Sequence, residues 1–151
     1  MKVFGTTGTS NFPSLIKELD RIGGKPEYDI TCQIADIDYE PNNGEFFRFS
    51  NKISTYFSEF DFFVCHAGTG TIYTLLELRK KIIVVPNPEF KDNHQRDICH
   101  FIEKNNYGIV AWKVSEIEKL LPKLSSQKFN VYNNDNSRLG FEIAQIILNH
   151  E

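Results

Sequence analysis

The stretch that decides the fold is residues 62–95, which read FFVCHAGTGTIYTLLELRKKIIVVPNPEFKDNHQ. Residues 62–65 and 82–85 are apolar runs with the length and composition of buried strands. Between them lie small and hydroxylated residues at 66–71, followed by apolar residues at helical spacing over 72–78. Strand, glycine-containing turn, helix and strand together make one βαβ unit, and we expect its crossover to be right-handed.

The turn at 66–71 is built like an anion-binding site. Gly68 and Gly70 let backbone N–H groups approach a ligand closely, and the N-terminus of the following helix adds a positive partial charge. Tyr73 stands where the third glycine of a GxGxxG motif would be, so a tight turn capped by a threonine is the alternative reading of this loop. Two polar loops farther along the chain favour the ligand site, because they also follow strand ends, where open α/β sheets bind ligands.

Length and composition indicate an ordinary globular chain, which we expect to form a single domain over residues 1–151. Hydrophobic residues make up 40% and charged residues 25% of the sequence, which is usual for soluble proteins. The 17 Lys and Arg against 20 Asp and Glu give a net charge of −3 with no long run of either sign, which argues against nucleic-acid binding. The sequence has three cysteines, no signal peptide and no apolar segment approaching about 18 residues. We therefore expect reduced thiols and a cytoplasmic protein.

A second turn of small polar residues, GTSN at 8–11, follows the first predicted strand at 2–7. We expect the helix after it to begin at Pro13 and to end at the glycines of 23–24. A helix cap is enough to explain Ser10 taken singly. Two turns of this kind in one chain nevertheless favour a ligand that both of them contact.

The segments not yet placed continue the alternation of strands and helices. We expect strands at 28–34, 46–49 and 109–112, and helices at 53–60, 93–106, 115–124 and 137–150. Ser115 is the expected cap of the helix that it begins. The alternation predicts an α/β fold, a Rossmann-like parallel sheet of about six strands with helices on both faces. Strand order 3-2-1-4-5-6 would place the turns after strands one and four side by side, facing one ligand.

Six short motifs carry a resemblance to a known family. They are GTSNF at 8–12, Gln33, YEP at 39–41 and, most specifically, HAGTGT at 66–71, VVPN at 84–87 and DNHQ at 92–95. In this order and spacing they resemble the nucleotide-sugar-binding, C-terminal half of GT-B glycosyltransferases, the glycosyltransferase family 28 C-terminal domain. More closely, the chain resembles the small donor-binding, catalytic subunit of two-part enzymes, namely the dolichol-linked N-acetylglucosaminyltransferase and its bacterial capsule and exopolysaccharide counterparts. The resemblance covers nearly the whole chain.

The resemblance implies that a UDP-sugar donor is held across the crevice. Its hexosyl group would pass, with inversion, to a lipid-linked acceptor in polysaccharide or glycan biosynthesis. A membrane-associated partner subunit would bind the acceptor, so this chain would be one half of a heterodimer at the inner face of the membrane. The helix expected at 137–150 is the candidate element for docking that partner. Because GT-B enzymes generally need no metal and no carboxylate cluster is evident, we expect neither a metal nor a cofactor.

The resemblance also implies which residues bind the substrate. His66 would lie near the diphosphate and is the best candidate for a catalytic role. The other implied residues are Thr9, Ser10, Gly68, Thr69, Gly70 and Thr71 at the diphosphate, Asn93, His94 and Gln95 toward the sugar, and Phe49 and Ser50 by the uracil, with Gly8, Ala67 and Asn87 completing the set.

Thr74 is a departure from the family pattern, because many members of the wider fold have there a glutamate that holds the ribose hydroxyls. Glu77 lies one helical turn later. The departure leaves the donor open among UDP-N-acetylglucosamine, UDP-galactose and UDP-glucuronate. It also leaves open a non-catalytic nucleotide-sugar-binding or regulatory subunit.

Structural roles compete with several of these assignments. A satisfied histidine at a strand end is the alternative for His66, and a surface position is the alternative for His94 and Gln95. Gln33 could equally order a loop. A metal site formed by His66, His94, Cys99 and His100 is disfavoured, because His94 and Cys99 are five residues apart and would not share a helix face. A stand-alone nucleotide-sugar hydrolase or epimerase is the rival enzyme, for which only His66 or His94 offers a base.

Overall fold

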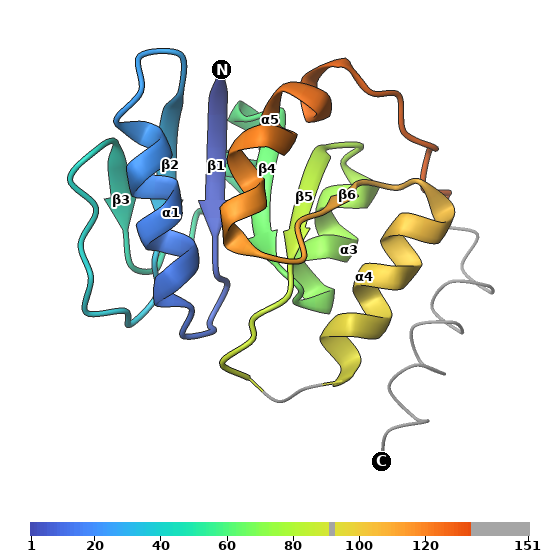
Figure 1. Ribbon diagram of the computed structural model, residues 1–151, viewed down its shortest axis with the longest axis horizontal. Coiled ribbons are helices and arrows are strands. Elements are labelled where there is room, and N and C mark those ends of the chain that lie inside the picture. Colours follow the sequence, from blue (N-terminus) through green and yellow to red (C-terminus); the bar gives the residue numbers. More distant parts are fainter. Residues whose placement is uncertain (91–92, 134–151) are drawn as a thin grey trace.

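A six-stranded sheet runs through the computed structural model, which describes residues 1–90 and 93–133 (Figure 1). Its strands follow the order β3-β2-β1-β4-β5-β6, and every neighbouring pair is parallel. The strand order predicted from the sequence is confirmed. The strands are β1 Lys2–Thr6, β2 Asp29–Gln33, β3 Glu45–Phe47, β4 Phe62–His66, β5 Lys81–Val85 and β6 Ile109–Val110.

Helices cover both faces of the sheet, as predicted. α1 and α5 pack on one face, whereas α2, α3 and α4 pack on the other (Figure 1). The helix expected at 137–150 lies outside the described residues, and its docking role stays a prediction. The helices are α1 Pro13–Gly23, α2 Ile53–Glu59, α3 Thr69–Glu77, α4 Asn93–Asn105 and α5 Ile117–Ser126, with a short 3-10 helix, η1 Val114–Glu116, before α5.

The central strands β4 and β5 explain the two apolar runs of the deciding stretch. Alternate residues of a strand point to opposite faces, and both faces here are covered. Phe63 therefore packs with α2, α3 and α4, while Val64 packs with α1 and α5, and both are fully buried. Strands buried on both faces read as continuous hydrophobic runs, as expected for a parallel sheet.

α3 begins earlier than its sequence indicates. Residues 69–71, expected in the turn, form the first turn of the helix. Glycine has a low helix propensity, but tertiary packing overrides it. Here Ile72 and Leu75 are buried against the sheet and fix the helix that contains Gly70.

The expectation that Ser115 caps a helix is wrong. Ser115 lies inside η1, and α5 begins at Ile117. The carboxylate of Glu116 instead accepts hydrogen bonds from the backbone N–H groups of Trp112 (3.0 Å) and Lys113 (3.4 Å). Of the two adjacent polar residues, Glu116 rather than Ser115 accepts the backbone hydrogen bonds.

Two edge strands are shorter than expected. The strand expected at 46–49 is Glu45–Phe47, and the strand expected at 109–112 is Ile109–Val110. Pairing at the second edge continues for one more bond, because the N–H of Ala111 donates to the carbonyl of Val84 at 2.9 Å.

The three cysteines are free and buried in two different layers. Cys32 of β2 packs on the side of α1, and Cys65 of β4 and Cys99 of α4 pack on the opposite side. Burial raises the pKa of each of these thiols to about 12. All three are therefore protonated at neutral pH.

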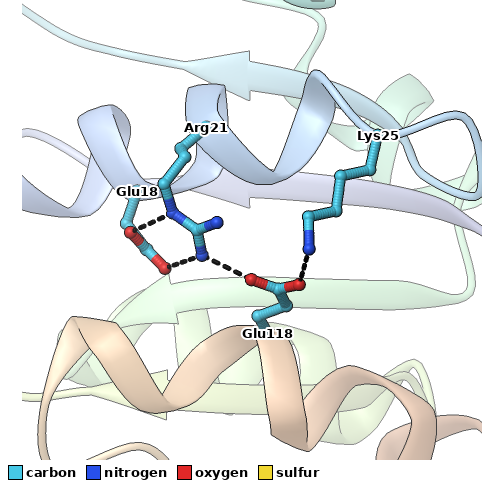
Figure 2. Close-up of polar contacts among 4 residues, drawn as sticks. All are labelled: Glu18, Arg21, Lys25 and Glu118. Carbon is cyan, nitrogen blue, oxygen red and sulfur yellow. Dashed lines mark hydrogen bonds and ion pairs between the residues drawn. The ribbon is translucent and has the colours of Figure 1, made fainter.

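An ion-pair network joins α1 to α5 on the solvent side (Figure 2). Arg21 donates to Glu18 through Nε at 3.1 Å and Nη2 at 2.7 Å, and its Nη2 lies 2.5 Å from Oε2 of Glu118. Lys25 donates to the other carboxylate oxygen of Glu118. Hydrogen bonds from Lys25 and Arg21 lower the pKa of Glu118. Because these side chains are accessible to solvent, the network contributes little to the stability of the fold.

Asp20 anchors the long loop between β2 and β3. The carboxylate is 5% exposed and accepts hydrogen bonds from the backbone N–H groups of Asn42 (2.9 Å) and Asn43 (2.7 Å) and from the hydroxyl of Tyr39. Burial by itself would raise the pKa of Asp20, but these hydrogen bonds outweigh it and lower the pKa below its usual 3.8. The YEP motif thus has a structural role through its tyrosine.

Replacing Asp20 by alanine should lower the free energy of unfolding by about 1–3 kcal/mol at pH 7, because three donors lose a charged acceptor. A group whose pKa is lowered by folding stabilises the protein above its unfolded pKa, and that stability is lost as the pH falls through the folded pKa. The difference between wild type and Asp20→Ala in urea denaturation should therefore shrink as the pH falls below about 3.8. Tyr39→Phe, which removes one donor, should have a smaller effect in the same direction. A difference that is constant between pH 7 and pH 3 would contradict this assignment.

Candidate functional site

Three loops at the carboxyl edge of the sheet are joined by hydrogen bonds. Ser10, in the loop after β1, places its Oγ 3.1 Å from Nε2 of His66, the last residue of β4. Asn87, in the loop after β5, donates through Nδ2 to the carbonyl of Asn11 at 3.0 Å. The backbone N–H of Asn87 donates to Oε1 of Gln95 in the first turn of α4, at 2.7 Å. The loops after β1, β4 and β5 therefore form one framework, which we call the loop frame.

A relay of side chains shapes the first of these loops. Gln33 of β2 accepts a hydrogen bond from the Thr6 hydroxyl at 2.8 Å, and that hydroxyl accepts one from the N–H of Gly8 at 3.0 Å. Gly8 has a φ of 60°, in the left-handed region that favours glycine. Gln33 thus orders this loop through Thr6, which was one of its two expected roles.

Two glycines pack closely against the ring of His66. A Cβ at Gly68 would lie 2.5 Å from Cε1 and Nε2 of the imidazole, and one at Gly8 would lie 2.9 Å from Cε1. The side chain is 9% exposed, and burial lowers the pKa of His66 below its usual 6.5. The ring is therefore neutral at pH 7. Its Nδ1 has no hydrogen-bond partner among the described residues.

The N-terminus of α3 opens beside this histidine. Gly68 is the N-cap residue, and no side chain caps the helix. The first N–H groups of an α-helix have no partner within the helix, and together with the helix dipole they attract anions. Gly68 and Thr69, at this N-terminus, line a hollow of about 260 Å³ together with Ser10 and His66. The hollow has the donors that a phosphate group requires.

A larger hollow of about 620 Å³ lies on the other side of Gln95. Gln95 and Phe90 line both hollows. Phe90 is 60% exposed, so an aromatic ring stands at the rim between them. The two hollows are neighbours along the edge of the sheet, in the direction from β4 toward β6.

The structure brings together most of the residues expected to bind the substrate. Thr9 is exposed in the loop after β1, and Phe49 is 54% exposed beyond β3, outside both hollows. The hydroxyl of Ser50 accepts a hydrogen bond from the N–H of Lys52 at 3.0 Å. The expected contacts of these residues with the substrate stay predictions. The expected residues that line the smaller hollow are Ser10, His66, Ala67, Gly68, Thr69, His94 and Gln95, and those at the larger hollow are Asn87, Asn93 and Gln95.

Arg96 and Trp112 also line the larger hollow, and the sequence did not single them out as site residues. A signal for both was present. Arg96 directly follows the DNHQ motif, and Trp112 ends the segment expected as the sixth strand, whose carboxyl end lies on the same edge. Following every strand to that edge, rather than only those with motifs, would have found Trp112.

The described residues contain no group of three or more His, Cys, Asp or Glu side chains placed to hold a metal ion. Cys99 is fully buried in the core, whereas His100 is exposed and packs on Trp112. Within residues 1–90 and 93–133 no helix has the length and apolar character needed to cross a membrane.

Comparison with known proteins identifies the family. The profile described as glycosyltransferase family 28 C-terminal domain matches residues 5–141. This chain belongs to that family. The resemblance expected from the motifs is therefore confirmed, and with it the glycosyltransferase fold class.

Curated relatives of this family 28 chain include subunits of a UDP-N-acetylglucosamine transferase. The UDP-N-acetylglucosamine transferase subunit ALG13 of Candida albicans is 35% identical over 101 residues, which cover 67% of this chain and 32% of that protein. The subunit of the same name from Saccharomyces cerevisiae is 31% identical over 140 residues, which cover 79% of this chain and 68% of that protein. The chain thus spans about a third of the first protein and about two thirds of the second.

Solved structures share the fold of this family 28 chain at low sequence identity. The NMR structure of ALG13 has a TM-score of 0.61 at 20% identity and covers 99% of this chain and 96% of that one. The crystal structure of Acinetobacter baumannii MurG has a TM-score of 0.64 at 17% identity, over 82% of this chain and 41% of that one. The Rossmann-like sheet is therefore that of the C-terminal half of GT-B glycosyltransferases.

Alanine at Gly68 should lower the free energy of unfolding by about 1–3 kcal/mol, because its Cβ overlaps the ring of His66. Gly70→Ala is the matched control, since a Cβ there meets nothing within 4 Å and the residue is helical. It should be neutral or stabilising by up to about 1 kcal/mol. Urea denaturation of both variants measures the difference. In a Gly68→Ala/His66→Ala double variant the overlap is gone, so the two substitutions should couple favourably. If the effects of the two substitutions on the free energy of unfolding are strictly additive, the His66 ring does not need the space beside Gly68.

Proposed function

We propose that this chain is the donor-binding subunit of an inverting, UDP-sugar-dependent hexosyltransferase. A membrane-associated partner subunit would bind the lipid-linked acceptor and hold this chain at the cytoplasmic face of the membrane. The product would belong to polysaccharide or glycan biosynthesis. The family match supports glycosyl transfer, and the names of the ALG13 relatives, which are transferase subunits, support the two-part organisation.

The observation that carries the proposal is the uncapped N-terminus of α3 inside the loop frame. The frame holds Ser10 and His66 in contact at 3.1 Å, next to N–H groups without intrahelical partners. A diphosphate bound there would receive backbone and hydroxyl donors fixed before it arrives. Donors fixed in advance need no reorganisation when charge develops on the leaving group.

The chemical contribution of the chain would be to stabilise the departing UDP. In an inverting transfer the acceptor oxygen attacks the anomeric carbon from the face opposite the diphosphate. The bond from that carbon to the UDP oxygen breaks, and the electron pair leaves with UDP. The N-terminus of α3 would favour this added negative charge. The proton of the acceptor hydroxyl needs a general base.

His66 fits a positioning role better than that of the base. Its ring is neutral and enclosed, and one nitrogen is already in contact with Ser10. It would therefore hold the loop frame together around the diphosphate. We expect the base to come from the partner subunit, on the acceptor side of the crevice. The MurG comparison supports a second half, because this chain corresponds to 41% of that protein.

Thr74 favours one second candidate, a nucleotide-sugar-binding subunit without catalysis. It stands where related folds have the ribose-binding glutamate, and its hydroxyl donates to the carbonyl of Gly70 at 3.0 Å within α3. A subunit of this kind would bind UDP-sugars but release no UDP from them in the presence of partner and acceptor. Donor turnover by the complex distinguishes the two candidates.

Gly70→Asp should fold normally and lose UDP binding. A side chain at this position meets nothing within 4 Å, and a carboxylate in the first turn of a helix is favourable for the helix. The same carboxylate would repel a diphosphate, so the Kd for UDP should rise at least about tenfold. Calorimetric titration at low salt measures this, and Gly70→Asn is the control of equal size without the charge.

Gly70→Asn should retain most of the affinity for UDP, and thermal unfolding should show that both variants are folded. Equal UDP affinity of the wild type and Gly70→Asp would place the diphosphate elsewhere. A wild-type chain that binds no UDP, alone or co-purified with its partner subunit, would contradict the proposed function.

A further inference from the structure

The larger hollow of about 620 Å³ is lined by a cation, Arg96, that no described side chain neutralises. Arg96 is the fourth residue of α4, is exposed and lines the hollow. Within the described part of the chain it has neither an ion pair nor a hydrogen bond. It is also the one charged residue among the described residues that line this hollow. A guanidinium offers five N–H donors in a planar fork that matches a carboxylate or a phosphate.

Trp112 forms a fixed wall of the same hollow. Its Nε1 donates to the carboxylate of Glu103 at 2.9 Å, and its ring centroid lies 4.9 Å from that of His100. These contacts hold the indole in place before any ligand arrives. With Phe90 it gives the hollow flat aromatic surface beside the guanidinium. Aromatic walls with a few polar or charged groups are typical of small-molecule sites.

The position of the hollow relates it to one end of the donor. The smaller hollow, where the diphosphate is proposed, lies at the ends of β1 and β4, and the larger one lies at the end of β5 and reaches Trp112, just beyond β6. The residues expected at the uracil follow β3, at the opposite side of the sheet. A nucleotide sugar carries its sugar beyond the diphosphate, away from the base. The transferred sugar is therefore expected at the hollow that Arg96 lines.

We propose that this hollow receives a carboxylate on the transferred sugar, so that the donor is a UDP-hexuronate and Arg96 determines its specificity. The inference rests on the proposed function, since it assumes that the diphosphate binds at α3. It does not follow from overall electrostatics, because the chain has a net charge of −3 and its mean field disfavours an additional negative charge on the ligand. A preference for the acid would have to come from a local cation.

Three ligands separate this inference from the proposed function: UDP, UDP-glucose and UDP-glucuronate. UDP-glucuronate has a carboxylate where UDP-glucose has a hydroxymethyl group. Calorimetry on the 151-residue chain should give UDP-glucuronate a Kd about three- to tenfold lower than UDP-glucose, as for a charged hydrogen bond in a partly open site. Arg96→Gln should abolish this difference and leave the Kd of UDP unchanged. Lys104→Gln, at the other end of α4, changes the net charge equally and should leave the difference intact.

The fluorescence of Trp112 gives a second, direct readout, because it is the single tryptophan of the chain. UDP-glucuronate should change its emission more than UDP does, since only the sugar reaches this wall. If the chain binds UDP but has equal affinities for UDP-glucose and UDP-glucuronate, the inference is overturned and the proposed function stands. A loss of UDP binding in Arg96→Gln would have the same consequence, because it would place Arg96 at the diphosphate. Absence of binding of all three ligands, both to the chain alone and to the chain co-purified with its partner subunit, would contradict the proposed function and this inference together.

Discussion

Asn87 is the residue on which the arrangement of the crevice depends, because its hydrogen bonds connect loops that belong to different strands. It is 3% exposed and uses its backbone N–H, its side-chain N–H group and its side-chain oxygen, toward Gln95, Asn11 and Glu89 respectively. Buried polar groups that lose their partners cost the full penalty of desolvation. The loops after β1 and β5 therefore cannot separate without leaving such groups unpaired, and hydrogen bonds join this edge of the sheet into one rim.

The glycines of the HAGTGT motif gain a second explanation from this rim. From the sequence, Gly68 and Gly70 serve one purpose, the close approach of a ligand to the backbone. In the structure they differ. Gly68 makes room for the ring of His66, whereas the space over Gly70 is open. The same motif thus combines an internal packing requirement with an open face for a ligand, and a single substitution at each glycine affects a different one of the two.

The fold could be predicted from the sequence because its signals are local and repeated. The apolar runs at 62–65 and 82–85 have no polar face, which only a strand covered on both sides tolerates. The strand order then follows from placing two similar turns at the switch point. Capping was less predictable, since Ser115 and Glu116 are adjacent and either can accept backbone hydrogen bonds. The choice depends on where the N–H groups of Trp112 and Lys113 point, which is a property of the chain beyond β6.

The candidate site divides in the same way. Motif spacing brought Ser10 and His66 to one edge, because the positions of strand ends are encoded locally. The division of labour among the site residues was not encoded there. Gln95 is 7% exposed, and its side-chain oxygen accepts a hydrogen bond from the backbone N–H of Asn87, eight residues earlier. No sequence periodicity indicates such a bond. Arg96, its neighbour, is exposed and has a different environment. Adjacent residues of a helix point in different directions, so the first turn of α4 contains both a buried structural clamp and an exposed residue that lines the larger hollow.

The placement of the cysteines has a practical consequence for how opening of this fold can be followed. Cys32 lies under α1, and Cys65 and Cys99 lie between β4 and α4 on the opposite face. With thiol pKa values of about 12 and no exposure to solvent beyond 2%, none can react with an alkylating reagent while its layer is closed. The time course of labelling at each cysteine, resolved by mass spectrometry of peptides, would therefore report the opening rate of each face separately. The natural sequence already carries its probes, one on one side of the sheet and two on the other.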